Sequence, residues 1–291
     1  MSAEWDDLKT VLAVARSGTL AAAGADLGLN YTTVARRVQR AEAALGVNLF
    51  HRLPDGYRAT DIGLLVARHA ALMDQQADGL FRALQGQDQT LRGRLVVTAP
   101  QLLIGPHVAP VLEQFSEQHP EVEVLLRATN DLLDLNRREA DLAIRISRTP
   151  GDTLMGVRLC EQHAASFAAK SVAKRLKDYP DAPVEWIVYE QSPKVPKAAM
   201  ELYPNSKVRM VFDDMAAMVG AAQAGLGVVR MPMFLGRASE GLEQVLVLPP
   251  QPYADIWVVA HRDVWPSAKV KAFREMLVPW FKSHRDCFVS S

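Results

Sequence analysis

The sequence predicts an α/β protein with an all-helical beginning, and three observations support this fold class. Apolar residues recur at helical spacing through the first 45 residues. A second amphipathic pattern runs from about residue 61 to residue 87. From residue 93 onward, short β-branched or apolar runs alternate with helical patterns, which is typical of parallel sheets covered by helices.

Composition places the chain among ordinary globular proteins. It has 291 residues, of which 49% are hydrophobic, and its formal net charge is zero. This length is enough for two or three domains. Because the whole chain is neutral, any affinity for nucleic acid must come from a local patch. One such patch is present, since residues 36–58 contain five arginines and only two acids.

The sequence also gives an expectation for compartment and thiol chemistry. No apolar run approaches the roughly 18–20 residues that span a bilayer. The acidic start, MSAEWDDL, lacks the features of a signal peptide, so we expect the protein in the cytoplasm. In that reducing compartment Cys160 and Cys287 are expected to be free thiols, with a redox-sensing pair as the alternative.

The first 45 residues predict three helices. Residues 5–17 form the first, which Gly18 closes. Thr19 is the expected N-cap of the second, and Gly28 permits the tight turn after it. Asn30 is the expected N-cap of the third helix. One face of that helix carries a buried apolar stripe made of Val34, Val38, Ala41 and Leu45.

A basic hairpin is predicted after the third helix, with a turn at residues 53–58. Two helices joined by a tight turn and followed by a hairpin make a winged helix-turn-helix, which places a short helix in the DNA major groove. The core beneath is expected to include Leu27, Leu49 and Phe50. The residues expected to contact DNA are Tyr31, Thr32, Thr33, Arg36, Arg37, Arg40, Arg52 and Arg58.

Arg36 is the strongest of these candidates, because an outward-facing guanidinium can bond guanine O6 and N7 or a phosphate. Thr32 and Thr33 either approach phosphates and thymine methyl groups or only cap the helix. Arg52 and Arg58 flank the hairpin and are expected to neutralise phosphates.

Three further candidates keep two interpretations each. For Tyr31, a DNA contact is what resemblance to a known protein family implies, and packing of its ring against the first helix is the alternative. Arg37 and Arg40 neutralise phosphates or pair with Glu42 or Glu4. Sequence spacing does not decide between these alternatives.

The long helix at residues 61–87 carries apolar residues at helical spacing for roughly seven turns. A helix of this length between domains usually pairs with a second copy, which favours a dimer. The alternative is a helix that packs only on its own domain.

Strands and helices alternate in the rest of the chain. The expected strands are residues 95–99, 122–128, 141–146, 163–169, 186–189, 208–212, 227–231, 245–248 and 256–261. Helical patterns cover residues 103–119 and 131–139, and a final helix is expected over about 267–281.

These features resemble the LysR-type transcriptional regulators over nearly the whole chain. Residues 22–37 read AAGADLGLNYTTVARR, and E-x-x-L-G-V-x-L-F-H-R from Glu42 and T-x-x-G from Thr60 follow in the family's order. Later matches begin at Leu95 (LVVTA), Glu139 (EADLAIR) and Ala224 (AGLGV). Ala35 and Ala41 depart from the family pattern, which often has Ser and Leu there, and the change at Ala35 removes one hydroxyl that could contact DNA.

The resemblance implies a domain plan. Residues 1–60 would form the DNA-binding domain, 61–90 a dimerisation helix and 91–291 a two-lobed effector domain like a periplasmic solute receptor. Lobe I would comprise 93–162 and 267–291, and lobe II 163–266. The chain would cross between lobes near 160–163 and 262–268.

The resemblance also implies function and partners. The partners would be double-stranded promoter DNA, a second copy in a dimer or dimer of dimers, and RNA polymerase. A small-molecule effector between the lobes would modulate DNA binding or bending.

Effector ligands in two-lobed α/β receptors sit at the carboxyl ends of strands. The expected effector-binding residues follow such strands: Pro100, Gln101, Thr129, Asn130, Arg145 and Asp213. The alternative for Arg145 is a surface or interlobe salt bridge with Asp141 or an acid of lobe II. Capping of the next helix is the alternative for Asp213 and Asp214. The sequence does not identify the effector.

Other classes of protein fit less well. The chain has no G-x-S-x-G, Walker or H-E-x-x-H motif, so an α/β enzyme is not favoured. No histidine has metal-ligand spacing, so neither a metal nor a cofactor is expected. A plain solute receptor would not explain residues 1–90, and a nucleoid-like architectural protein would not explain an effector domain.

Overall fold

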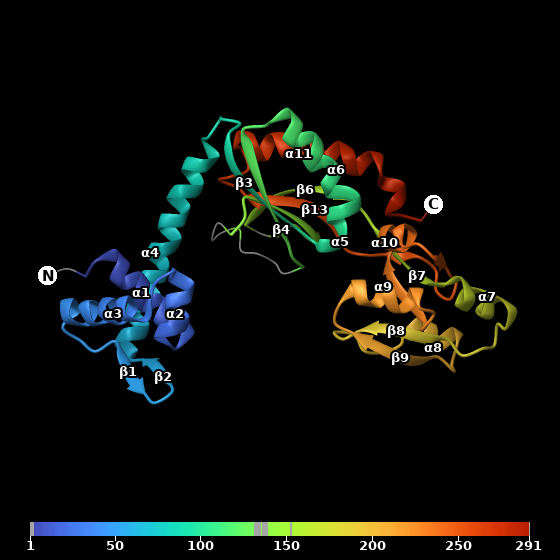
Figure 1. Cartoon of the computed structure of the whole chain (residues 1–291), viewed down its shortest axis with the longest axis horizontal. Helices are drawn as coiled ribbons and strands as arrows, with labels where there is room; N and C mark the ends of the chain where they lie inside the picture. Colours follow the sequence, from blue (N-terminus) through green and yellow to red (C-terminus); the bar gives the residue numbers. More distant parts are fainter. Residues whose placement is uncertain (1–2, 131–134, 136–138, 152, 291) are drawn as a thin grey trace. The chain divides into compact units, whose positions relative to one another are not determined.

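The computed structural model describes residues 3–130, 135, 139–151 and 153–290. The chain divides into two compact units, residues 1–84 and 85–291 (Figure 1). The helix expected over 131–139 falls mostly outside the described residues.

The first unit contains the three expected helices, α1 (Trp5–Ser17), α2 (Leu20–Leu27) and α3 (Tyr31–Leu45). Both predicted N-caps are confirmed: Thr19 Oγ1 accepts from the Ala22 amide at 3.1 Å, and Asn30 Oδ1 accepts from the Thr33 amide at 2.8 Å. A hairpin of β1 (Phe50–Leu53) and β2 (Gly56–Ala59) follows, and then α4 (Asp61–Gly86) begins. Local capping chemistry therefore sets these helix boundaries.

The core of this unit joins α1, α2 and α3 to the start of the hairpin. Its buried residues include Val11, Val14, Leu20, Val34, Val38, Ala41, Leu49 and Phe50. The assignment of Leu45 to the core was wrong, because Leu45 is 40% exposed. Leu45 is the last residue of α3, after the buried residues Val34, Val38 and Ala41 of the same stripe.

Two sequence motifs explain how the hairpin is attached. The Glu42 carboxylate accepts from the amides of Leu49, at 2.8 Å, and Phe50, at 3.4 Å. Thr60 Oγ1 donates to the Asn48 and Leu49 carbonyls and accepts from the Gly63 amide at 2.9 Å. A Cβ at Gly63 would lie 2.0 Å from the Leu49 carbonyl oxygen, so only glycine permits this close approach.

Helix α4 has two faces of different character. Ala67 and Ala70 are buried with Leu12 of α1. Other large apolar residues of α4 are exposed, namely Ile62, Leu64, Leu65, Leu72, Met73, Leu80, Phe81 and Leu84. Most of these share one face at helical spacing, so the described residues of the first unit leave an apolar face of α4 uncovered.

The second unit contains two sheets. Lobe I has the order β4 (Val122–Ala128), β3 (Gly93–Ala99), β5 (Leu142–Ser147), β13 (Asp255–His261) and β6 (Leu154–Cys160). Strand β3 is parallel to β4 and β5, whereas β13 is antiparallel to β5 and β6. The sheet is therefore mixed, not purely parallel.

Strand β13 corrects the predicted lobe boundary. The sequence placed residues 256–261 in lobe II, with the second crossing at 262–268, but β13 pairs inside lobe I. Ile256, Val258 and Ala260 alternate into the lobe I core and are fully buried. The second crossing therefore lies between Pro252 and Asp255, before the strand and not after it.

Lobe II has the strand order β11 (Leu242–Gln244), β7 (His163–Ala169), β10 (Val228–Pro232), β8 (Glu185–Tyr189) and β9 (Lys207–Phe212), with β12 (Gln251–Pro252) also paired to β7. Its helices are α7 (Lys170–Asp178), α8 (Lys197–Leu202), α9 (Met215–Gln223) and α10 (Met233–Ala238). The strand expected at 245–248 does not form, although Val245, Val247 and Leu248 are buried in the lobe's core.

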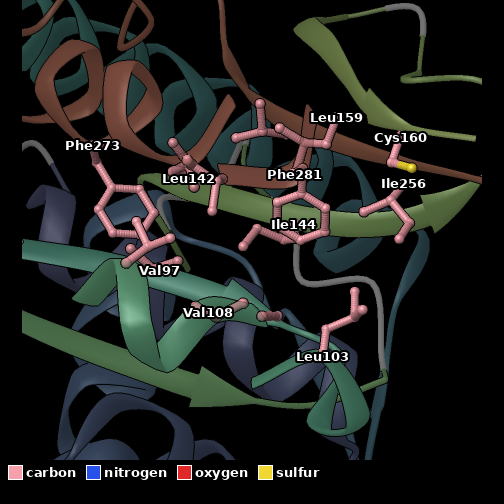
Figure 2. Close-up of a cluster of buried hydrophobic side chains, with 14 of the residues drawn as sticks. Val97, Leu103, Val108, Leu142, Ile144, Leu159, Cys160, Ile256, Phe273 and Phe281 are labelled. Atoms are coloured by element: carbon pink, nitrogen blue, oxygen red, sulfur yellow. The ribbon is translucent and has the colours of Figure 1, made fainter. Parts of the chain in front are cut away.

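The lobe I core lies between its sheet and the helices α6 (Ala109–Gln118) and α11 (Ala268–Ser283). Short helical turns, α5 (Gln101–Leu103) and a π-helical turn at Ile104–Val108, precede α6. Figure 2 shows Phe273 and Phe281 of α11 directed at strand residues such as Val97 and Ile144. Among the described residues, no helix is long and apolar enough to cross a membrane.

The segment after α11, residues 285–290, connects lobe I to lobe II; we call it the C-terminal strap. The His163 amide donates to the Phe288 carbonyl at 2.8 Å. Arg237 of α10 donates to the Val289 carbonyl at 3.0 Å and to the Asp286 carbonyl. Phe288 is fully buried. The two lobes thus meet at the strap as well as at the two chain crossings.

Candidate DNA-binding surface and effector cavity

Helix α3 presents a polar face whose most prominent cation is Arg36. Val34, Val38 and Ala41 bury the opposite side of the helix, which turns Arg36 outward. Among the described residues no ion pair or hydrogen bond involves Arg36, so its guanidinium stays available to an external partner. An exposed Arg on such a face can bond a base edge or a phosphate.

The two neighbouring arginines, Arg37 and Arg40, form ion pairs within the protein. Arg37 pairs with Asp6 at 2.8 Å. Arg40 binds the buried Asp7 carboxylate with two hydrogen bonds of 2.7 and 2.6 Å and also pairs with Glu4 at 3.1 Å. The alternative of pairing with Glu4 is therefore confirmed for Arg40, whereas Glu42 binds backbone amides instead. These contacts fix α3 on α1.

The residues at the start of α3 have different situations. Thr32 Oγ1 donates to Asn30 Oδ1 at 2.8 Å, so its hydroxyl takes part in the cap. The Thr33 amide is the capped group itself, and its side chain is half-buried. Tyr31 is 57% exposed, so its ring is not covered by α1.

The hairpin carries Arg52 and Arg58 on opposite faces. The register pairs His51 with Arg58 and Arg52 with Tyr57, and paired residues share a face. The Tyr57 ring packs on Phe50, with ring centroids 6.0 Å apart, and both arginines are exposed. The Tyr57 amide donates to the Gly18 carbonyl at 2.7 Å, which ties the hairpin to the turn between α1 and α2.

The second unit contains a cavity of about 540 Å³ lined by both lobes, which we call the interlobe cavity. It lies where β3, β4, β8 and β10 end, as expected for a ligand site in an α/β receptor. Its lining residues are Thr98, Pro100, Leu102, Thr129, Asn130, Ile144, Arg145, Ile146, Tyr189, Gln191, Ser192, Met215, Arg230, Pro232, Phe234 and Tyr253.

Four of the six residues expected to bind an effector line this cavity: Pro100, Thr129, Asn130 and Arg145. Gln101 and Asp213 are exposed and do not appear among its described lining residues. The neighbouring Asp214 accepts from the Ala217 amide at 2.9 Å and caps α9, which is the alternative considered for this pair.

The lobe II residues that line the cavity, above all Arg230, were not predicted from the sequence. A signal was present, since Arg230 is the one charged residue within the apolar strand Val228–Pro232. Its Nη2 atom donates to the Ala164 and Pro249 carbonyls, at 3.2 and 3.3 Å, and to Gln251 Oε1 at 3.2 Å.

Beside these two sites, the described residues include the two cysteines and the potential metal ligands. Cys160 is buried, and burial raises the pKa of its thiol to about 11, whereas Cys287 is exposed; both are free. Within the described ranges, no cluster of three or more His, Cys, Asp or Glu could hold a metal ion.

Comparison with family models matches both units. Residues 5–64 match the bacterial regulatory helix-turn-helix protein, lysR family, and residues 88–282 match the LysR substrate binding domain. The Mau operon transcriptional activator of Paracoccus denitrificans is 26% identical over 261 residues, covering 88% of this chain and 89% of that protein. An HTH-type transcriptional regulator of Xanthomonas campestris pv. campestris is 31% identical over 175 residues, or 60% of this chain, and the match spans about half (51%) of that regulator.

Solved structures show the same fold. The full-length Vibrio cholerae virulence activator AphB has a TM-score of 0.57 at 18% identity, covering 96% of this chain and 99% of that chain. The effector domain of AmpR from Pseudomonas aeruginosa has a TM-score of 0.55 at 22% identity, covering 66% of this chain and 98% of that chain.

Proposed function

The chain belongs to the LysR family of bacterial transcriptional regulators, and from this premise we propose that it reads a promoter site through α3 and the β1–β2 hairpin. A small molecule in the interlobe cavity modulates that binding. A protein that binds promoter DNA acts where the chromosome is, so we assign it to the cytoplasm. RNA polymerase is the proposed downstream partner.

The exposure of Arg36 is the observation that carries the DNA-binding proposal. Arg36 supplies the base contact, and Tyr31, Thr32 and Thr33 approach the backbone at the start of α3. Arg52 and Arg58 neutralise phosphates from the two faces of the hairpin. Arg37 and Arg40 act mainly by holding α3 on α1 through Asp6 and Asp7, a supporting role and not a direct contact.

Two variants on one helix test this assignment. In fluorescence anisotropy with the chain's own upstream DNA, Arg36→Ala is expected to weaken binding by roughly 1–3 kcal/mol and to relax base preference. Arg37→Ala is the matched control: it removes the same side chain from the same helix, but one that is paired with Asp6. Unchanged affinity for Arg36→Ala, or an equal loss in both variants, would mean that another face of α3 docks.

Footprinting on the same DNA separates site-specific regulation from architectural binding. A protected inverted repeat is expected, because a paired reader recognises two half-sites. Salt-sensitive coverage without any preferred position would instead favour the architectural class.

A second copy of the chain is the proposed partner of α4. The exposed apolar face of that helix is the supporting observation, since monomers seldom leave such a patch in water. Pairing places two copies of α3 on one promoter and so multiplies a modest local affinity. Pairing of dimers into a tetramer is part of the same proposal.

A further inference from the structure

The charged residues described around the interlobe cavity are all of one sign. Among its described lining residues, Arg145 and Arg230 are cationic and none is acidic. A neighbouring hollow of about 550 Å³ in lobe II shares Arg230 and adds Lys194 and Lys197, again with no acid among its described lining residues. Two adjoining hollows with cations and without carboxylates favour an anionic occupant.

Arg230 lies at the boundary of the two hollows, and its surroundings leave its charge unbalanced. The three groups that accept from its Nη2 are neutral, at the long end of the hydrogen-bond range. Its Nη1 is buried and has no hydrogen-bond partner among the described residues, and no carboxylate there lies within ion-pair distance. Burial also lowers the pKa of this guanidinium.

Such an arrangement is costly unless something else supplies the counter-charge. A half-buried cation whose hydrogen-bond acceptors are all neutral is only partly compensated for the hydration it has lost. A guanidinium matches a carboxylate in shape, with paired N–H donors facing two oxygens. A carboxylate entering the cavity would therefore find a receptor that is already partly dehydrated and held in place on β10.

The remaining walls describe the rest of the ligand. Leu102, Ile144, Ile146, Met215 and Phe234 are apolar, and they come from both lobes. Thr98, Ser192, Tyr189 and Tyr253 also line the cavity and carry hydroxyl groups. A ligand that fills this space needs an apolar body as well as an anionic head.

Resting on the proposed function, we infer that the effector is a small organic carboxylate whose single anionic head binds Arg230 while its apolar body fills the interlobe cavity. Arg230 of lobe II binds the carboxylate of the ligand, and the apolar residues of lobe I pack against its apolar body.

The test uses the full chain and two matched probe pairs, benzoate against benzamide and hexanoate against hexanamide. Binding is measured by the shift in thermal unfolding and by calorimetric titration. At least one acid is expected to bind tenfold or more tightly than its amide, and inorganic phosphate, which lacks an apolar body, is expected to bind far more weakly. If neither acid surpasses its amide, or if phosphate equals the acids, the inference is wrong.

Variants locate the binding group. Arg230→Gln is expected to reduce the preference for acid over amide to below twofold, and Arg230→Lys is expected to retain part of it. Arg209→Gln is the matched control, because Arg209 also lies on a lobe II strand but pairs with Glu185 at 2.8 Å. If Arg230→Gln lowers thermal stability yet keeps the full acid preference, Arg230 only ties β10 to its neighbours and the inference is overturned.

Promoter binding by the same preparations keeps the two proposals apart. Specific promoter binding without any acid preference would overturn the effector class and leave the regulator intact. Acid preference without specific promoter binding would do the reverse. Should Arg230→Gln fail to fold, the wild-type acid and amide comparison and Arg230→Lys still decide the outcome.

Discussion

Truncation of Leu80 on α4 tests whether the uncovered apolar face is an interface between copies. Full burial of a leucine side chain stabilises by roughly 1.5–3 kcal/mol, so burying the exposed 60% of Leu80 contributes roughly 1–2 kcal/mol. A two-fold interface contains each contact twice. Leu80→Ala is therefore expected to weaken a dimer by roughly 2–4 kcal/mol, or roughly 30- to 700-fold in Kd.

Sedimentation equilibrium over a range of concentrations measures this change directly. Leu246→Ala is the control, because Leu246 is 81% exposed but belongs to lobe II of the second unit and not to α4. Only the α4 variant should move the monomer–dimer midpoint. If both variants associate like the wild type, α4 is not the dimer contact, and if both weaken association equally, the effect is not specific to this face.

Three further predictions concern stability, thiols and the hairpin. Burial lowers the pKa of His107 from 6.5 to about 4, so unfolding takes up a proton and the free energy of unfolding falls as the pH drops from 6.5 to 4. Between pH 7 and pH 5, urea titrations should show the wild type losing about 2 kcal/mol more of this free energy than His107→Leu. Equal losses in the two proteins would contradict the assignment. At pH 8 a thiol reagent should titrate Cys287 rapidly and the buried Cys160 only after denaturation, so two fast thiols would refute the placement. In Gly56→Ala the new Cβ would lie 2.5 Å from the Gly18 carbonyl oxygen, so the hairpin must shift; promoter affinity should fall while circular dichroism stays the same, and unchanged affinity would show that the hairpin contributes no contact.

Local chemistry made the first unit predictable. Thr19, Gly28 and Asn30 act on residues within a few positions, so their capping and turn roles follow from sequence spacing alone. The pair between Asp7 and Arg40 was not predictable, because its members are 33 residues apart and meet only when α1 packs on α3.

Long-range pairing limited the predictions for the second unit. The sequence identified residues 256–261 as a strand, but periodicity carries no information on which sheet that strand joins. The same limit applies to the cavity. Pro100 and Thr129 were predicted because they directly follow predicted strands of lobe I in the sequence. Arg230 reaches the cavity through the position of β10 in the lobe II sheet, which the sequence pattern does not reveal.

The C-terminal strap makes the last residues of the chain a mechanical part of the receptor. With Phe288 buried and Arg237 bonded to two strap carbonyls, lobe II is tethered at three places on one side. Because the three connections lie along one edge, the lobes rotate about that edge more easily than they slide past each other. A deletion of residues 285–290 would thus weaken the connection about which the lobes rotate without changing the residues that line the interlobe cavity. A bulky fusion at that end would stiffen or displace the strap.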